Sequence, residues 1–257
     1  MVGRRSHPSD PRGNERALRL ELTLVIPCYN EEACIEEVVS SWVKEISRRI
    51  SGFSIVVVDD GSKDQTPQIL QKLKGRYPEL KVIRQQNQGH GAALLTGYKA
   101  AEGTWVFHTD SDNQFVPEDF WKLWELRNET PYVIGIRMNR DDPWFRLIIS
   151  RILRLISRVL TGVPVRDLNI PYKLIRKDLL DQLLPSIPSD TFAPSILLVL
   201  GAHYKGVSFR QVEVKHLPRT TGETVLRPWR LFRSCLQAFR QLAQYWFAVR
   251  KRWPKEL

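Results

Sequence analysis

The chain has 257 residues, of which 42% are apolar and 26% are charged. This length and composition suit one large α/β domain or two small ones, and they exclude disorder, coiled coil and collagen as descriptions of the whole chain. Lysine and arginine number 39 against 28 acidic residues, so the formal net charge is +11. The excess predicts an anionic partner, and nucleic acid, lipid headgroups and nucleotide phosphates all satisfy it.

The cysteines and the N-terminus indicate a protein of a reducing compartment. Cys28, Cys34 and Cys235 form neither a CxxC pair nor an even framework, so neither a disulfide scaffold nor a zinc site is expected. Residues 1–20 are basic and lack the apolar centre of a signal peptide, which predicts a flexible tail. The longest apolar run, 196–202, is far shorter than the roughly 18 to 20 residues of a transmembrane helix. We therefore expect no membrane span.

Short β-branched runs then alternate with amphipathic segments, the pattern of a mostly parallel sheet covered by helices. The expected strands are 22–27, 53–58, 80–85, 104–109 and 132–136. The expected helices between them are 31–50, 64–77, 91–102 and 117–128. Ligands of an open α/β sheet bind at the carboxyl ends of its strands, so the residues that follow each strand should carry the chemistry.

Two further amphipathic helices are expected in the second half, at 144–160 and 229–249. Both coincide with a surplus of positive charge, namely seven arginines against two aspartates over 137–166 and eight basic residues against Glu256 over 227–257. Such helices suit the headgroup region of an anionic membrane. Packing of their apolar faces on the domain, or on a second subunit, is the alternative.

Carboxylates follow two of the expected strands. Asp59 and Asp60 precede Gly61, where they either cap a turn or present an acceptor to a base N–H or a ribose hydroxyl. Asp110 and Asp112 end the fourth strand, and two carboxylates at this spacing can reach one hard divalent cation that shares its shell with substrate phosphates. An ordinary Asp-rich turn is the alternative. A substrate that carries phosphate and requires a metal would explain the carboxylates at both strand ends.

Five segments extend this pattern: VIPCYNEE (25–32), VVVDDGSKDQTPQIL (56–70), NQGHGAALLTGYKAAEGTWVFHTDSDNQFVPEDF (87–120), VIGIRMNR (133–140) and VKHLPRTTGET (214–224). In this order and spacing they resemble the GT-A fold glycosyltransferases of family 2, near the dolichol- and polyprenyl-phosphate sugar synthases. The resemblance implies a Rossmann-like GT-A domain over 21–226, with a mostly parallel sheet flanked by helices, followed by a C-terminal amphipathic region at 227–257. It also implies a metal-dependent, inverting transfer of a sugar from a GDP- or UDP-sugar to polyprenyl or dolichyl phosphate.

The resemblance assigns roles to matching positions. Contacts with the nucleoside are expected from Pro27, Tyr29, Glu31, Val58, Asp60 and Ser111. Mg2+ or Mn2+ is expected to be held by Asp110, Asp112 and Gln114. The cations around the phosphates are expected to be Arg137, Arg146 and Arg219. Physical chemistry agrees, because a departing diphosphate needs a metal and cationic donors.

The chain departs from the family pattern where a catalytic base is usual. In the stretch that corresponds to the usual base, 191–195, no carboxylate follows Asp190, and Val249 stands where processive enzymes have a QxxRW residue. A processive polysaccharide synthase is therefore disfavoured. A lipid phosphate is already anionic and needs positioning rather than deprotonation, which fits the missing base. A hydroxyl acceptor would need one, and its candidates are Asp167, Asp190 and His216. Asp167 and His216 join Asp112 and Arg219 as the expected catalytic residues.

The alternatives to this interpretation come from different classes. A nucleic-acid-binding protein is disfavoured because no RNP, KH or helix-turn-helix signature appears and the aromatic residues occupy apolar helix faces. A GT-A transferase with a glycolipid or soluble hydroxyl acceptor stays open, as does an inactive membrane protein that binds nucleotide sugars. We expect a peripheral protein on the cytoplasmic face of a membrane, bound to an anionic lipid surface, and leave a homo-oligomer open.

Overall fold

The computed structural model describes residues 20–138, 162–191, 193–218, 240–241, 243–248 and 251. Within these ranges a seven-stranded sheet has the order β3-β2-β1-β4-β6-β5-β7. The strands are β1 (Leu22–Cys28), β2 (Phe53–Asp59), β3 (Leu80–Arg84), β4 (Trp105–Thr109), β5 (Tyr132–Met138), β6 (Tyr172–Arg176) and β7 (Arg210–Lys215). Only β6 runs antiparallel to its neighbours, β4 and β5, and the remaining described pairings are parallel. The expected α/β class with a mostly parallel sheet is confirmed.

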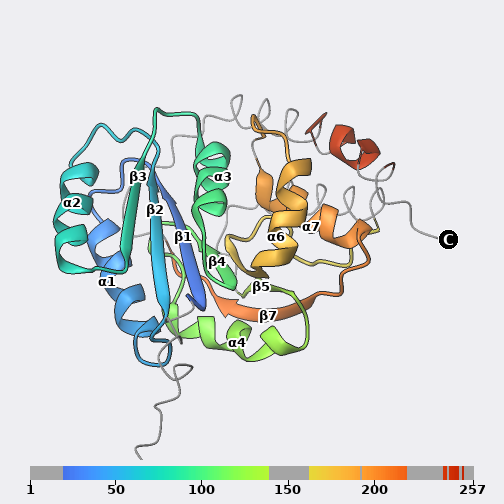
Figure 1. The fold of residues 1–257 in the computed structure, drawn as a ribbon, viewed down its shortest axis with the longest axis horizontal. Helices are drawn as coiled ribbons and strands as arrows, with labels where there is room; N and C mark the ends of the chain where they lie inside the picture. The colour runs from blue at the N-terminus through green and yellow to red at the C-terminus, as the bar shows by residue number, and fades with distance from the viewer. Residues whose placement is uncertain are drawn as a thin grey trace, which may run out of the picture.

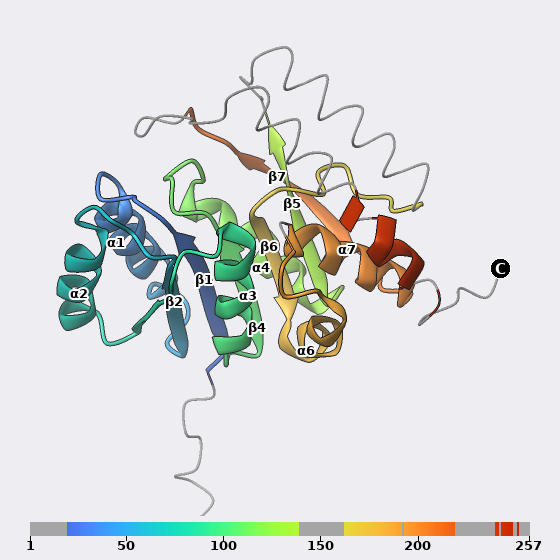
Figure 2. The same ribbon diagram turned by 90° about the horizontal axis from the view of Figure 1, so that it is seen from above.

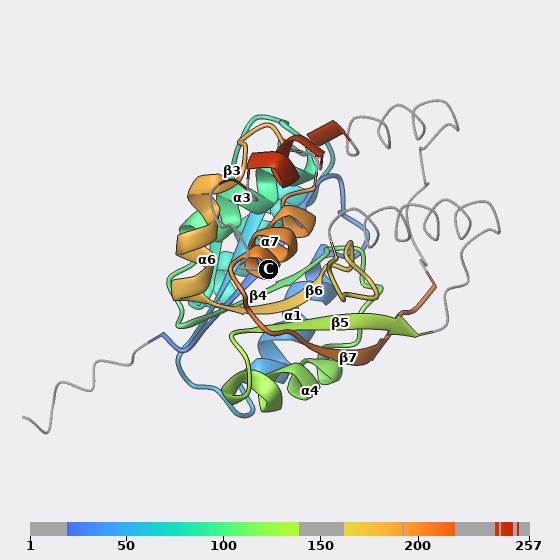
Figure 3. The ribbon, with the colours of Figure 1, turned by 90° about the vertical axis from the view of Figure 1, so that its right-hand side faces the viewer.

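Helices cover both faces of this sheet and make a three-layer domain (Figure 3). Their bounds are α1 (Ile35–Ile46), α2 (Thr66–Arg76), α3 (His90–Ala100), α4 (Phe120–Glu125), α6 (Lys177–Leu183) and α7 (Pro194–Tyr204). Helices α3, α6 and α7 lie on one face, and α1 and α4 lie on the other (Figure 3). Viewed as in Figure 1, the elements from β1 to α2 occupy the left of the domain and α6 and α7 the right.

The face toward α1 and α4 is held by an aromatic cluster. Phe107 of β4 lies 5.3 Å from Trp42 of α1, 5.0 Å from Phe120 of α4 and 4.7 Å from Tyr172 of β6, measured between ring centroids. Tilted and edge-to-face rings at these distances add attraction beyond the burial of their area. Because side chains alternate along a strand, the residues after Phe107 and Tyr172 point to the opposite face, toward α3 and α7. Those residues are His108 and Lys173, which are paired across β4 and β6.

The chain passes very close to β1 where it enters β4. A Cβ added to Gly103 would lie 2.5 Å from the backbone nitrogen of Thr23 and 2.6 Å from the carbonyl carbon of Leu22. The amide of Gly103 also donates to the hydroxyl of Thr23 at 2.9 Å. Only glycine fits this crossing, which fixes where β4 starts and hence where its carboxyl end lies.

Several expected boundaries differ from the structure. The helix expected over 31–50 is shorter, since α1 begins at Ile35, and the one expected over 117–128 is broken into α4 between two 3-10 turns, Pro117–Asp119 and Leu126–Asn128. The apolar run 196–202 lies within the buried helix α7. Among the described residues no helix combines the length and hydropathy that crossing a bilayer requires.

The expected amphipathic helix 144–160 lies outside the described residues, as do residues 1–19 and most of 219–257. Of the expected helix 229–249, residues 240–241 and 243–248 are helical (drawn in red in Figure 2). Tyr245 in this piece is buried, and its hydroxyl lies 2.9 Å from that of Ser186. Gln241 donates to the carbonyl of Asp190 at 3.1 Å. The described part of this helix therefore packs on the domain through Tyr245 and Gln241. Packing on the domain is the alternative to membrane contact given in the sequence analysis.

Candidate active site

A cleft of about 430 Å3 opens at the carboxyl ends of β1, β2 and β4. Its walls come from the ends of these strands and from the segment that leads into α3. The lining residues are Pro27, Cys28, Tyr29, Glu31, Asp60, Asn87, Gly89, His90, Ala93, Asp110, Ser111 and Asp112. Seven residues predicted from the sequence to bind the nucleotide or the metal are among them. Val58 is not, because it is fully buried and packs against Ala93 in the core.

The wall after β1 is tied to the turn after β2. The amide of Asn30 donates to Ser62 Oγ at 3.0 Å, and the Asn30 side-chain oxygen accepts from the amide of Lys63 at 2.8 Å. Asn30 has a φ of 53°, a left-handed conformation that asparagine tolerates better than most residues. Cys34 Sγ donates to the Glu31 carboxylate at 3.2 Å and to the carbonyl of Ser111 at 3.1 Å. Glu31 is thus held at the entrance to the cleft.

The two carboxylates after β2 shape the backbone around the cleft. Asp59 Oδ1 accepts from the amide of Ser62 at 2.8 Å, which caps the turn. Asp60 accepts through Oδ1 from Gln85 Nε2 at 2.8 Å and the amide of Gln88 at 3.0 Å, and through Oδ2 from the amide of Gly89 at 2.8 Å. Asp60 therefore fixes the loop that leads into α3, and contact with a base would come in addition to this role.

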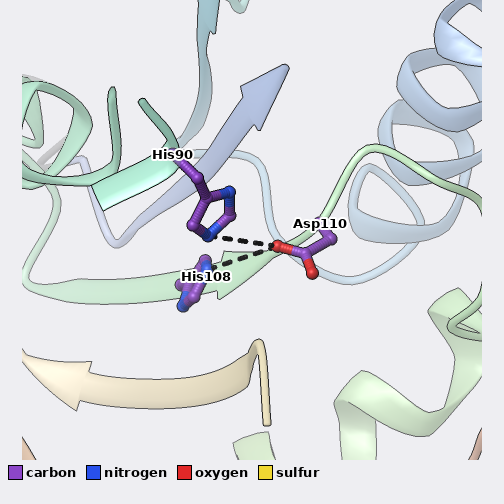
Figure 4. Close-up of side chains that lie close together, drawn as sticks. All are labelled: His90, His108 and Asp110. Carbon is purple, nitrogen blue, oxygen red and sulfur yellow. Dashed lines mark ion pairs between the residues drawn. The ribbon is translucent and has the colours of Figure 1, made fainter. Parts of the chain in front are cut away.

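Asp110 lies between two imidazoles (Figure 4). Its Oδ1 is 3.8 Å from His90 Nε2 and 3.8 Å from His108 Nε2, and the three ligand-type atoms lie within 4.8 Å of one another. His108 Nδ1 lies 3.2 Å from the Tyr98 hydroxyl of α3. Asp110 Oδ1 and His108 Nε2 are buried and have no hydrogen-bond partner.

The surroundings of His108 and Asp110 lower the pKa of both side chains. Burial lowers the pKa of His108, against the pull of Asp110, so the ring is held neutral. Burial would raise the pKa of Asp110, but the neighbouring imidazoles of His108 and His90 outweigh it and lower the pKa of that carboxyl below its ordinary value. The site thus presents an ionised carboxylate beside a neutral imidazole.

The DSD turn is joined to the end of β7. Gln114 donates its amide N–H to Asp112 Oδ1 at 3.2 Å and its side-chain Nε2 to the carbonyl of Leu217 at 3.0 Å. A β-bridge pairs Phe115 with His216, and their rings lie 5.1 Å apart. The structure therefore brings His216 close to the DSD turn. The Gln114 side-chain oxygen, Oε1, is the atom that would contact a metal.

Arg137 and Asp167 form a two-point ion pair. Arg137 Nε donates to Asp167 Oδ2 at 2.8 Å and Nη2 donates to Oδ1 at 3.0 Å. Both side chains are largely buried, at 15% and 9% exposure. A carboxylate held in this way by a guanidinium is stabilised as the anion and is a weak base. The ion pair thus joins a residue expected to contact the phosphates, Arg137, to one expected to be catalytic, Asp167.

Lys173 of β6 is a buried basic residue on the face of the sheet toward α3 and α7. Its Nζ donates to the carbonyl of Leu168 at 2.7 Å and to that of Ser195, in the first turn of α7, at 3.2 Å. Burial lowers the pKa of Lys173 to about 7, with Asp167 opposing the shift. Two other predicted residues, Arg146 and Arg219, lie outside the described residues.

The donor set at the DSD turn fits a divalent cation. Asp110 and Asp112 both line the cleft, and the buried, unpartnered Asp110 oxygen is a group that an ion or water would satisfy. His108 was missed as a site residue, although one signal pointed to it. His108 lies two residues before the expected metal ligand Asp110, and residues two apart along a strand share a face of the sheet.

Comparison with known proteins agrees with this geometry. An undecaprenyl-phosphate 4-deoxy-4-formamido-L-arabinose transferase of Pseudomonas fluorescens is 32% identical over 214 residues, which cover 82% of this chain and 61% of that protein. The transferase of the same name from Pseudomonas syringae is 30% identical over 213 residues, with 82% and 62% covered. The chain thus spans about three fifths of the length of these curated relatives.

Solved structures and a family model extend the comparison. Glucosyl-3-phosphoglycerate synthase from Mycobacterium tuberculosis, crystallised with UDP, superposes with a TM-score of 0.63 at 20% identity, covering 88% of this chain and 80% of that one. Its complex with Mn2+, UDP-glucose and phosphoglyceric acid gives 0.63 at 18% identity, with the same coverage. These structures support the GT-A fold. The model of "Glycosyl transferase family 2" matches residues 23–184, more than half of the chain. The chain belongs to glycosyl transferase family 2.

Proposed function

We propose that this protein is a metal-dependent, inverting glycosyltransferase that moves a sugar from a nucleotide sugar to a polyprenyl phosphate. The observation that carries the proposal is the cleft at the carboxyl ends of β1, β2 and β4, where Asp110 and Asp112 lie with the positions expected to bind the nucleoside. Membership of the family supports sugar transfer, and the names of the Pseudomonas relatives support undecaprenyl phosphate as the acceptor.

The donor would lie with its nucleoside against the wall after β1. Pro27 and Glu31 line this wall, and Tyr29, at 41% exposure, offers an open ring face for a base. Asp110 and Asp112 would hold Mg2+ or Mn2+, with Gln114 beside them. Such an ion neutralises charge that develops on a departing diphosphate.

The pairing of Asp167 with Arg137 supports one kind of acceptor chemistry. Its two-point pairing with Arg137 leaves it a weak base, which suits an acceptor that arrives already ionised. A lipid phosphate has this property and a sugar hydroxyl does not. The acceptor oxygen would then attack without deprotonation by the protein, and its alignment would limit the rate.

Membrane contact is part of the same proposal. The basic surpluses over 137–166 and 227–257 would meet anionic headgroups on the cytoplasmic face. In the C-terminal piece, Tyr245 packs on the domain whereas Phe247 is 65% exposed. One side of this piece is therefore anchored and the other is available to lipid.

The test is transfer by the purified full chain from UDP- and GDP-sugars to undecaprenyl phosphate in vesicles, with Mn2+ or Mg2+. Asp110→Asn and Asp112→Asn should each lower kcat/KM by at least about a hundredfold, since each removes a charge from the metal site. Asp178→Asn, which alters an exposed carboxylate on α6, is the matched control. Turnover equal to wild type in the Asp110 and Asp112 variants would refute the proposal.

The acceptor is tested separately with a pH–rate profile. A lipid phosphate acceptor predicts no essential base between pH 5 and about 8. A single ionisation in this range that disappears in His216→Gln or Asp190→Asn would instead favour a hydroxyl acceptor.

A further inference from the structure

Three ligand-type atoms from α3 and from the end of β4 converge beside the cleft, which His90 and Asp110 line (Figure 4). His90 is the first residue of α3, His108 belongs to β4, and Asp110 directly follows β4. Both imidazoles direct Nε2 at the same oxygen, Asp110 Oδ1. Neither contact is a hydrogen bond, because 3.8 Å is beyond the range of N–H···O bonds.

Two atoms of this cluster are buried, which makes their lack of partners informative. The His108 side chain is 2% exposed, and its Nε2 and Asp110 Oδ1 have no hydrogen-bond partner. A buried polar atom without a partner is uncommon in folded proteins and indicates an ion or a water that the site accommodates. The other ring nitrogen of His108 contacts the Tyr98 hydroxyl, which fixes the orientation of the ring. Outer contacts of this type are typical of histidines that bind metals.

We propose that His90, His108 and Asp110 form a mixed nitrogen and oxygen site for a borderline divalent metal such as Mn2+, Co2+ or Zn2+, in preference to Mg2+. Imidazole suits these metals, whereas Mg2+ favours carboxylate, carbonyl and water oxygens. The inference deepens the proposed function, because the same cation would serve the diphosphate of the donor.

The spacing of the three atoms suits such an ion. Two ligands that each lie about 2.1 Å from a shared metal are roughly 3 to 4 Å apart. Both histidine contacts with Asp110 Oδ1, at 3.8 Å, fall in this range. The ligand nitrogens of the two imidazoles lie within 4.8 Å of each other, so closing onto one ion takes at most a small inward movement. His90 can supply it because its side chain is 52% exposed.

The experiment measures binding of the metal alone to the full chain. Calorimetric titration should give a dissociation constant for Mn2+ at least about tenfold lower than that for Mg2+. Pulsed electron paramagnetic resonance of the Mn2+-loaded protein should show hyperfine coupling to imidazole nitrogen. Neither readout requires sugar transfer, so failure of the proposed function and failure of this site are distinguishable.

Variants assign the coupling to residues. His90→Gln changes a half-exposed side chain and should retain the fold, weaken Mn2+ binding at least about tenfold and leave Mg2+ binding within about twofold. His108→Asn should remove a second nitrogen coupling, and His203→Gln, at a histidine of α7 outside the cluster, should change neither. Absence of Mn2+ binding, or binding without nitrogen coupling and unchanged in His90→Gln, would overturn the proposal. The contacts would then mean that His108 reaches Asp110 through a water.

Discussion

Replacing Lys173 by methionine tests the electrostatics beneath the cleft. In the folded protein burial lowers the pKa of Lys173 to about 7, whereas its ordinary value is 10.5. Between these two values the unfolded chain holds about one more proton at this residue than the folded chain. The free energy of unfolding therefore rises with pH across this window, by about 1.4 kcal/mol per pH unit.

The magnitude follows from the two pKa values. At pH 7 the folded lysine is about half protonated, so the rise between pH 7 and pH 9 amounts to roughly 2 kcal/mol. Lys173→Met lacks the ionisation and should lack this rise. The variant also loses the hydrogen bonds to the carbonyls of Leu168 and Ser195, but that loss changes little with pH. The difference between wild type and variant should thus shift by about 2 kcal/mol in favour of wild type as the pH rises from 7 to 9.

The assay is urea unfolding at pH 7, 8 and 9, read as midpoint and slope. Lys81→Met, at an exposed lysine near Glu102, is the matched control and should follow wild type at every pH. Parallel pH dependences of wild type and Lys173→Met would refute the reasoning, since they would mean that the buried amine keeps its ordinary proton affinity.

Two further pairs of substitutions test the packing of the sheet and the ion pair beside it. Gly103→Ala places a Cβ against the β1 backbone and should lower the free energy of unfolding by about 1 to 3 kcal/mol. A Cβ added at Gly75, in α2, would have nothing within 4 Å, so Gly75→Ala should raise the free energy of unfolding by up to about 1 kcal/mol. Equal melting temperatures of the two variants would contradict both expectations. Arg137→Met should cost about 3 kcal/mol in urea unfolding because Asp167 loses its guanidinium, and adding Asp167→Leu should recover most of that; an unrecovered loss would contradict the pairing.

The first half of the fold was predictable because its local signals agree. Each of the five expected strands is an apolar run that ends near polar or turn-forming residues, and all five are present. The DSD turn was located correctly at the end of the fourth strand for the same reason. Strand β6 was not predicted. This strand includes Lys173, and a lysine in the sequence argues against a strand that is buried on both faces. The two backbone carbonyls that accept from Lys173 become known only from the structure.

The candidate site was predictable only where its residues are close in sequence. Seven of the expected residues line the cleft because strand ends gather them. The pairing of Arg137 with Asp167 joins β5 to the loop before β6 across 30 residues, and no local sequence pattern predicts it. Val58 was assigned to the nucleoside by position, but the alternation of β2 sends it into the core against α3. The contact of Tyr98 with His108 likewise depends on how α3 packs on the sheet.

His108 and Lys173 pair across β4 and β6 and face α3 and α7, so the sheet beneath the cleft carries two adjacent buried polar groups. Apolar side chains at both positions would avoid the desolvation that lowers the pKa of each residue, and would thereby stabilise the fold. Their presence is explained if each serves the cleft. His108 adjoins Asp110 at the proposed metal site, and Lys173 ties the loop after Asp167 to the start of α7. Departures from an apolar core are expected at functional sites, where binding offsets the lost stability. We infer that this polar pair is retained for the site rather than for the stability of the fold.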